Sequence, residues 1–253
     1  MKTYSTTEVA QIIGIHPNTV RLYEELGLVP KAERLANRYR VFTDFHVEQF
    51  KLARVALKVE VLQSGLRKKA VEIIKISATG KFHAAISLTK EYLLNLQQEQ
   101  KNAEEAISIA QRLLSGDKQV SRELCLTRKE TADFLQVSMD TLRNWELNGL
   151  LTVKRKKNGY RIYTGEDIKR LKIIRSLRCA NYSLAAILRM LSTLTQNPKA
   201  NIRKVIDTPE ENDDIISVCD KLLTSLKYAE QNATQMLFQL ENMQKEFFYN
   251  HTL

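Results

Sequence analysis

The chain has 253 residues, with 39 Lys+Arg against 29 Asp+Glu, a formal net charge of +10 and a hydrophobic fraction of 43 %. This length allows one large or two ordinary domains, and the apolar content argues against a disordered chain. Only 8 Gly and 4 Pro occur, so we expect a mainly helical protein rather than a turn-rich β architecture. The 3 cysteines lie far apart without a CxxC spacing, so the sequence predicts no disulfide framework, no metal site and no other cofactor.

The charge is unevenly distributed along the chain. Residues 1–84 carry a net charge of +6 and residues 121–204 one of +11, whereas residues 85–120 and 205–253 carry −1 and −6. This alternation predicts two modules that bind a polyanion and two segments that do not. No run of 18 apolar residues and no signal-peptide core occurs, so we expect a cytoplasmic protein without a membrane partner.

The two basic segments repeat one another. Residues 4–29 align with residues 126–151, and residues 37–43 align with residues 158–164 after one residue is dropped. Two copies are too few for a solenoid, so we interpret them as a duplicated domain.

Each copy predicts two short helices joined by a tight turn. Thr6 and Thr127 are the expected N-caps of the first helices, because a Glu follows each at nearly the capping-box spacing. The second helix begins at Pro17 in one copy and after Ser138 in the other. Its C-terminal end is expected at a left-handed glycine in both copies, Gly27 and Gly149.

A β-rich stretch around a turn follows, at residues 31–42 and 153–163. Asn158-Gly159 is a strong hairpin signal in the second copy, and we expect a different turn in the first copy, which lacks this Gly. A helix-turn-helix followed by a hairpin is a winged helix. We therefore expect two winged helix-turn-helix domains, at residues 1–80 and 125–204.

The second helix of such a unit enters the major groove of DNA through its N-terminal residues. Asn18 can pair with adenine and Asp140 can accept from cytosine, although a helix N-terminus favours an acidic residue by itself. Tyr23 and Trp145 fit phosphate contact and a role as apolar anchors equally well. The expected contacts from these ends are His16, Asn18, Thr19 and Arg21 in the first copy, and Ser138, Asp140, Thr141 and Arg143 in the second.

The hairpins add a second group of cations. They are Lys31, Arg34, Arg38 and Arg40 in the first copy, and Lys154, Arg155, Lys156, Lys157 and Arg161 in the second. A charge run is usually a solvated face, but both runs fall on the hairpin of a helix-turn-helix unit, so we expect phosphate contacts. Double-stranded DNA is the expected partner, with an affinity that falls steeply as salt is added.

These motifs resemble the MerR family of transcriptional regulators. The matching stretches are VRLYE with Gly27-Leu28, LRNWE with Gly149-Leu150, NRYRVF at 37–42, NGYRIY at 158–163, and residues 177–184, which resemble the helix pair after the wing. The resemblance implies winged-helix domains that bind DNA and distort its groove. It assigns DNA contacts to Thr19, Arg21, Tyr23, Arg38 and Arg40, and to Thr141, Arg143, Trp145, Arg155 and Arg161. The family commonly has two adjacent tyrosines, and here the first of these positions holds Leu22 or Asn144.

Two further segments predict long coiled-coil helices. Apolar residues from Ile86 to Leu114 and from Ile215 to Phe247 recur at alternating spacings of 3 and 4. We expect helices at residues 85–115 and 208–250, with a polar linker at 116–124 after the first helix. The methionines of the second segment are interpreted as seam packing rather than as a ligand site.

MerR-type proteins are symmetric dimers held by an antiparallel pair of such helices, as the resemblance implies. One chain can reproduce this arrangement if the first long helix ends beside the second domain and the second helix runs back antiparallel to it. We therefore hypothesise a pseudo-dimer within one chain that reads an imperfect palindrome. A homodimer joined through the longer second helix is the alternative.

No nucleophile elbow, phosphate loop or metal motif occurs, so we expect no enzyme activity. Cys179 and Cys219 are expected to be small buried hydrophobes, with redox or metal sensing as the alternative. Two functions stay open. The first is a sequence-specific transcription regulator, for which RNA polymerase or another protein is a further candidate partner. The second is a structural DNA organiser or anchoring protein whose coiled coil recruits a protein. The different second helices of the two copies favour the regulator.

Overall fold

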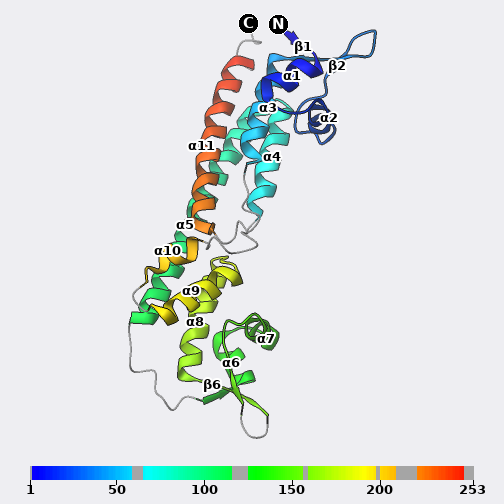
Figure 1. Cartoon of the computed structure of the whole chain (residues 1–253). Coiled ribbons are helices and arrows are strands. Elements are labelled where there is room, and N and C mark those ends of the chain that lie inside the picture. The colour runs from blue at the N-terminus through cyan, green and yellow to red at the C-terminus, as the bar shows by residue number, and fades with distance from the viewer. Residues whose placement is uncertain are drawn as a thin grey trace. The chain divides into compact units, whose positions relative to one another are not determined.

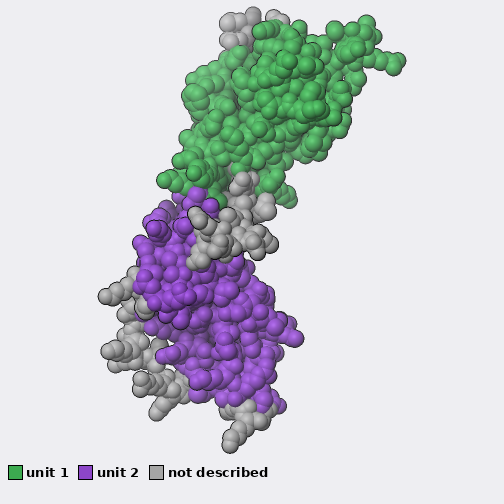
Figure 2. Space-filling model, viewed as in Figure 1, with its two compact units in different colours: residues 1–98, 225–253 green, residues 99–224 purple. Residues whose placement is uncertain are grey.

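The computed structural model describes residues 2–58, 65–115, 125–155, 159–197, 200–208 and 221–247. The chain divides into two compact units, which Figure 2 colours separately: unit 1 comprises residues 1–98 and 225–253, and unit 2 comprises residues 99–224. The predicted linker at 116–124 lies outside the described residues. None of the described helices is both long enough and apolar enough to cross a membrane.

Unit 1 contains the first winged module (Figure 1). Its elements are β1 (Thr3–Tyr4), α1 (Thr6–Ile13), α2 (Pro17–Glu25), β2 (Glu33–Arg34), β3 (Arg40–Thr43), α3 (Asp44–Ala56) and α4 (Leu66–Ala78). The strands form an antiparallel sheet in the order β1-β3-β2. This order makes β3 the centre of the wing and ties its base to the start of the chain.

Unit 2 contains the second module, which repeats this order of elements. They are β4 (Cys125–Thr127), α6 (Arg128–Leu135), α7 (Met139–Leu147), β5 (Lys154–Arg155), β6 (Arg161–Thr164), α8 (Gly165–Cys179) and α9 (Leu184–Gln196), with α10 (Ile202–Asp207) added. The sheet order is again β4-β6-β5. The prediction of a mainly helical chain with two winged helix-turn-helix domains is confirmed, whereas β1 and β4 were not predicted.

The helix caps follow the sequence signals with one correction. Ser5, not Thr6, is the N-cap of α1: its hydroxyl accepts from the Glu8 amide at 3.3 Å, and its own amide donates to the Glu8 carboxylate at 2.7 Å. Thr127 caps α6 as expected, with Glu130 as its partner. The correction is one residue because the capping box requires the Glu at the third helical position.

The wing tips share a left-handed residue at matching positions. Gly159 has the left-handed φ of 81° that an Asn-Gly hairpin signal predicts. Arg38, which matches it in the first copy, has a φ of 66°. An arginine thus adopts the left-handed conformation that glycine adopts in the second wing, while the expectation of a different turn stays a prediction because residues 156–158 lie outside the described residues.

Helices α5 (Phe82–Ser115) and α11 (Leu222–Phe247) are the two long helices of the chain. The predicted start of the second helix near Thr208 and its predicted end at residues 248–250 fall beyond the part of α11 that is described. Within α11 the buried residues keep the predicted spacing of 3 and 4: Leu222, Leu226, Ala229, Ala233, Met236, Leu240 and Met243. In α5 the predicted positions Thr89, Leu96, Ala103, Ile107 and Ala110 are buried, whereas Tyr92 is buried rather than Leu93 and Leu114 is exposed.

In unit 1, α11 packs beside the first part of α5. The Phe45 ring of α3 lies 5.8 Å from the Phe82 ring at the start of α5 and 5.4 Å from the Phe247 ring at the end of α11. Farther along, the Gln97 side-chain amide donates to the Glu230 carboxylate at 2.9 Å. The start of one helix thus meets the end of the other, so the two helices run antiparallel here, and a regular coiled coil stays a prediction.

In unit 2, the second part of α5 packs against the second module. Arg203 of α10 forms an ion pair with Glu104 at 2.6 Å, and the Asn181 side chain donates to Glu99 at 3.3 Å. Each long helix therefore contacts the module that it does not directly follow in the chain.

Candidate nucleic-acid interface

We call α1, α2 and the β2–β3 hairpin head one, and α6, α7 and the β5–β6 hairpin head two. In head one, α2 begins at Pro17, and the His16 ring caps it because Nδ1 accepts from the Asn18 amide at 3.2 Å. The Asn18 side-chain oxygen also accepts from the Arg21 guanidinium at 3.4 Å. His16, Asn18 and Arg21 are exposed and Thr19 is half-buried, so this end of α2 presents polar groups to solvent.

Head two builds the same end from different residues. The Ser138 hydroxyl accepts from the Thr141 amide at 3.0 Å and lies 2.8 Å from the Thr141 hydroxyl. Asp140 and Arg143 are exposed one turn of helix apart. The two heads therefore offer the same kind of surface with different hydrogen-bonding groups.

Tyr23 and Trp145 lie in the cores of their heads. Tyr23 is 7 % exposed and stacks on Phe50 at 5.8 Å, and Trp145 is 4 % exposed. This burial favours the apolar-anchor interpretation over phosphate contact, because these rings attach α2 and α7 to the module behind them.

One predicted wing cation in each head is held in an internal ion pair. Arg40 Nε donates to the Glu24 carboxylate at 2.6 Å, and that carboxylate also accepts from the Ala32 amide at 3.1 Å. Arg161 forms the same 2.6 Å pair with Glu146 in head two. These pairs fasten each wing to its second helix, so Arg40 and Arg161 position the wing and have a carboxylate beside them.

The other described wing cations are exposed. They are Lys31, Arg34 and Arg38 in head one, and Lys154 and Arg155 in head two. Lys156 and Lys157 were also predicted contacts and lie outside the described residues. With Arg21 and Arg143 on the second helices, each head thus has exposed positive charge on both elements that a winged helix places on DNA.

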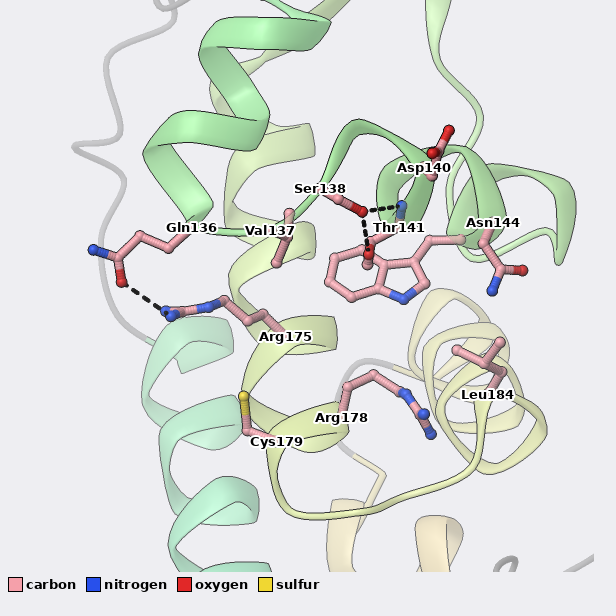
Figure 3. Close-up of a pocket in the computed structure, with 11 residues that line it drawn as sticks. Gln136, Val137, Ser138, Asp140, Thr141, Asn144, Arg175, Arg178, Cys179 and Leu184 are labelled. Carbon is pink, nitrogen blue, oxygen red and sulfur yellow. Dashed lines mark hydrogen bonds between the residues drawn. The ribbon is translucent and has the colours of Figure 1, made fainter.

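Head two also borders a pocket of about 710 Å³, shown in Figure 3. It lies between the α6–α7 turn, α7, α8 and the start of α9, and its lining includes Ser138 and Leu184. Arg175 reaches Gln136 at 3.4 Å, and Arg178 donates to the Tyr182 carbonyl. The sequence did not single out these two arginines, although their spacing of three on one helix placed them on a common face.

Cys179 lines the same pocket and is exposed, so the expectation of a buried thiol is wrong. It is the last residue of α8 and is not among the buried residues of that helix. Cys219 lies outside the described residues. Among the residues described, no three His, Cys, Asp or Glu side chains are grouped as a metal site would need.

A polar residue behind each head, the buried Gln49 of α3 or the half-buried Arg170 of α8, binds the chain just after the second helix. In head one the Gln49 amide donates to the Leu28 and Ile74 carbonyls, and its oxygen accepts from Ser77, all at 2.9 Å. In head two Arg170 takes this position and donates to the Leu150 carbonyl at 2.6 Å. Burial lowers the pKa of Arg170. Both residues hold the carbonyl that follows the second helix, which sets the angle of that helix on the module.

The helix that follows each wing, α3 or α8, is capped at its N-terminus by matched residues. His46 Nδ1 accepts from the Thr43 amide at 3.1 Å, and Asp167 accepts from the Thr164 amide at 2.8 Å. Burial lowers the pKa of His46. The neutral ring is thus the form that caps α3, since a protonated Nδ1 cannot accept a hydrogen bond.

Two parts of the chain match models of known protein families. Residues 5–42 match the MerR family regulatory protein model, and residues 126–194 match the MerR HTH family regulatory protein model. No solved structure matches the chain.

Curated relatives match over part of their length. The HTH-type transcriptional regulator CueR of Escherichia coli O157:H7 is 40 % identical over 53 residues, which are 21 % of this chain and 39 % of that protein. The HTH-type transcriptional regulator ZntR of Escherichia coli K12 is 38 % identical over 64 residues, 25 % of this chain and 45 % of that protein. A probable heavy metal-dependent transcriptional regulator of Haemophilus influenzae is 36 % identical over 77 residues, 30 % and 59 % respectively.

The aligned part thus spans less than two thirds of each of these relatives. The two family matches fall on the two modules that the structure builds from the same elements in the same order. The chain therefore contains two MerR-family helix-turn-helix domains.

Proposed function

We propose that this chain is a transcription regulator that binds a specific double-stranded DNA site as a pseudo-dimer within one polypeptide. Head one and head two each enter one half-site, and the site is an imperfect palindrome because the two second helices differ. The DNA is distorted between the half-sites, as the MerR resemblance implies. The relatives CueR and ZntR, whose names describe transcriptional regulators, support this class of function.

The observation that carries the proposal is the crossed packing of the long helices. In unit 1 the end of α11 meets Phe45 of the first module, and in unit 2 the later part of α5 is bonded to Asn181 and Arg203 of the second module. In a symmetric dimer, contacts of this kind would come from a second chain. Here both come from the same chain, so one polypeptide supplies what two would otherwise share.

Stoichiometry tests the pseudo-dimer. Duplexes selected from a random library by the full chain are analysed by native mass spectrometry. We expect one chain for each selected duplex, and two half-sites that differ in sequence. Two chains for each duplex with identical half-sites would show that the long α11 joins separate molecules instead.

Charge reversal tests the two DNA-facing helices. Arg21→Glu and Arg143→Glu should each abolish tight binding to the selected duplex while circular dichroism shows unchanged helical content. Arg112→Glu is the matched control, because Arg112 is exposed on α5 and the change in charge is the same. If both head variants bind as tightly as the control, α2 and α7 do not read DNA.

Specificity separates the regulator from a DNA organiser. A regulator should prefer its selected duplex over random DNA by ~10³ or more. Distortion is measured separately by energy transfer between dyes at the two ends of the duplex. Broad affinity without such a preference would favour the organising role, in which the long helices recruit another protein.

A further inference from the structure

The tip of wing one carries a conformational anomaly. Arg38 has a φ of 66°, in the left-handed region that residues other than Gly, Asn and Asp rarely occupy. The turn imposes this conformation: the Arg38 amide donates to the Leu35 carbonyl at 2.8 Å, and the Leu35 amide donates to the Tyr39 carbonyl at 2.9 Å. Gly159 stands at the matching position of wing two with a φ of 81°.

A side chain at this position weakens the fold. Replacing a left-handed glycine by an L-residue lowers the folding equilibrium constant by roughly fivefold or more. The described contacts of the Arg38 side chain include no interaction that would offset this loss of stability. It is exposed, and within the described residues its guanidinium makes no hydrogen bond or ion pair, while its carbonyl accepts from Arg34 at 3.4 Å.

The positive charge at the tip of wing one has no carboxylate partner among the described residues. Arg40 at the base of the wing is neutralised by Glu24 at 2.6 Å, whereas Arg34 beside the tip is also exposed. Strained residues are retained where a function needs them. A cation on an exposed hairpin tip, without an internal partner, fits an anion outside the chain.

We propose that Arg38 holds a positive charge at the tip of wing one for the phosphodiester backbone of DNA, at the expense of the stability of head one. This inference rests on the proposed DNA-binding function and adds a trade between stability and affinity that is confined to one head. Wing two keeps the relaxed glycine and relies on cations elsewhere in its hairpin.

Reciprocal substitutions test this trade in the full chain. Binding is measured to a mixed-sequence duplex of about 30 base pairs, which accommodates two half-sites one helical turn apart. Arg38→Gly should raise the urea midpoint of unfolding, weaken binding roughly three- to tenfold, and reduce the slope of log affinity against log salt by about 1. Gly159→Arg should lower the urea midpoint, strengthen binding and increase that slope by about 1.

Arg38→Lys is the matched control, because it keeps both the left-handed side chain and the charge. It should retain the parent's salt slope and the parent's lower stability. If Arg38→Gly raises the urea midpoint but changes neither the affinity nor the salt slope, Arg38 does not contact phosphate. If Arg38→Gly lowers the urea midpoint, the left-handed Arg38 does not destabilise head one. Failure of the parent itself to bind any duplex is a different result, which overturns the proposed function together with the contact.

Discussion

Replacing Gln49 by Leu should destabilise head one by about 3 kcal/mol. The Gln49 side chain is fully buried and makes three hydrogen bonds of 2.9 Å, to the Leu28 carbonyl, the Ile74 carbonyl and the Ser77 hydroxyl. Each such bond contributes about 1 kcal/mol net, and more when its partner is left buried without a replacement. Leucine has similar volume, so the loss comes from the hydrogen bonds rather than from a cavity.

Ser77→Ala is the matched control because it removes only one of these three bonds. It should destabilise by about 1 kcal/mol. Urea unfolding of the full chain is followed by circular dichroism, with an expected midpoint shift of about 1.5 M for Gln49→Leu if the dependence on urea is about 2 kcal/mol/M. The chain has a single tryptophan, Trp145, so its fluorescence reports head two independently in the same samples.

Equal urea midpoints of Gln49→Leu and Ser77→Ala would contradict a stabilising role of the buried amide. That result would mean that the two carbonyls find water or other donors when the amide is removed, and that the fold does not depend on the buried amide.

The other predictions concern an ion pair, a titrating ring and a buried hydroxyl. Glu24→Ala should lower the free energy of unfolding, measured in urea, by about 2 kcal/mol, because it leaves the half-buried Arg40 without its carboxylate. The exposed neighbour Glu25→Ala should change this free energy by no more than about 0.5 kcal/mol, and equal effects of the two variants would contradict the pairing. Burial lowers the pKa of His46, so the stability that its neutral ring contributes is complete above the ordinary value of 6.5 and is lost progressively as the pH falls below it. His46→Asp should flatten the pH dependence of the urea midpoint between about pH 7 and 5, and an unchanged profile would exclude the ring as the source of that dependence. Burial also raises the pKa of Tyr92 to about 12, and its hydroxyl has no hydrogen-bond partner among the described residues. Tyr92→Phe should therefore leave the Tm unchanged or raise it, and a clear drop in Tm would show that the hydroxyl has a partner after all.

The sequence predicted the parts of the fold that repeat or recur at a fixed spacing. The two heads follow from the internal repeat, and the buried face of α11 follows from its spacing of 3 and 4. In α5 the same spacing misplaced Leu93, because this helix packs against a winged module as well as against α11 and its buried face is set by both. Tyr92 rather than its neighbour therefore faces inward.

The sequence predicted which residues could form the candidate interface, but not which of its cations form ion pairs inside the chain. Nothing in a linear pattern of cations distinguishes Arg40, which pairs with a carboxylate sixteen positions away, from Arg34, which stays exposed. The strands β1 and β4 escaped prediction because two or three residues are too short to show alternation. Arg178 lines the head-two pocket, which is built from segments that are far apart in the sequence.

The contact between Phe45 and Phe247 has a consequence for biosynthesis. The aromatic ring that covers α3 of the first module is translated roughly two hundred residues after it. Domains generally fold as they emerge from the ribosome, N-terminal first. Here the Phe45 ring must wait for α11 before Phe247 packs against it, so a nascent chain leaves this side of Phe45 uncovered throughout synthesis of the second module. Truncated or stalled translation products should therefore be unusually prone to aggregation and to capture by chaperones.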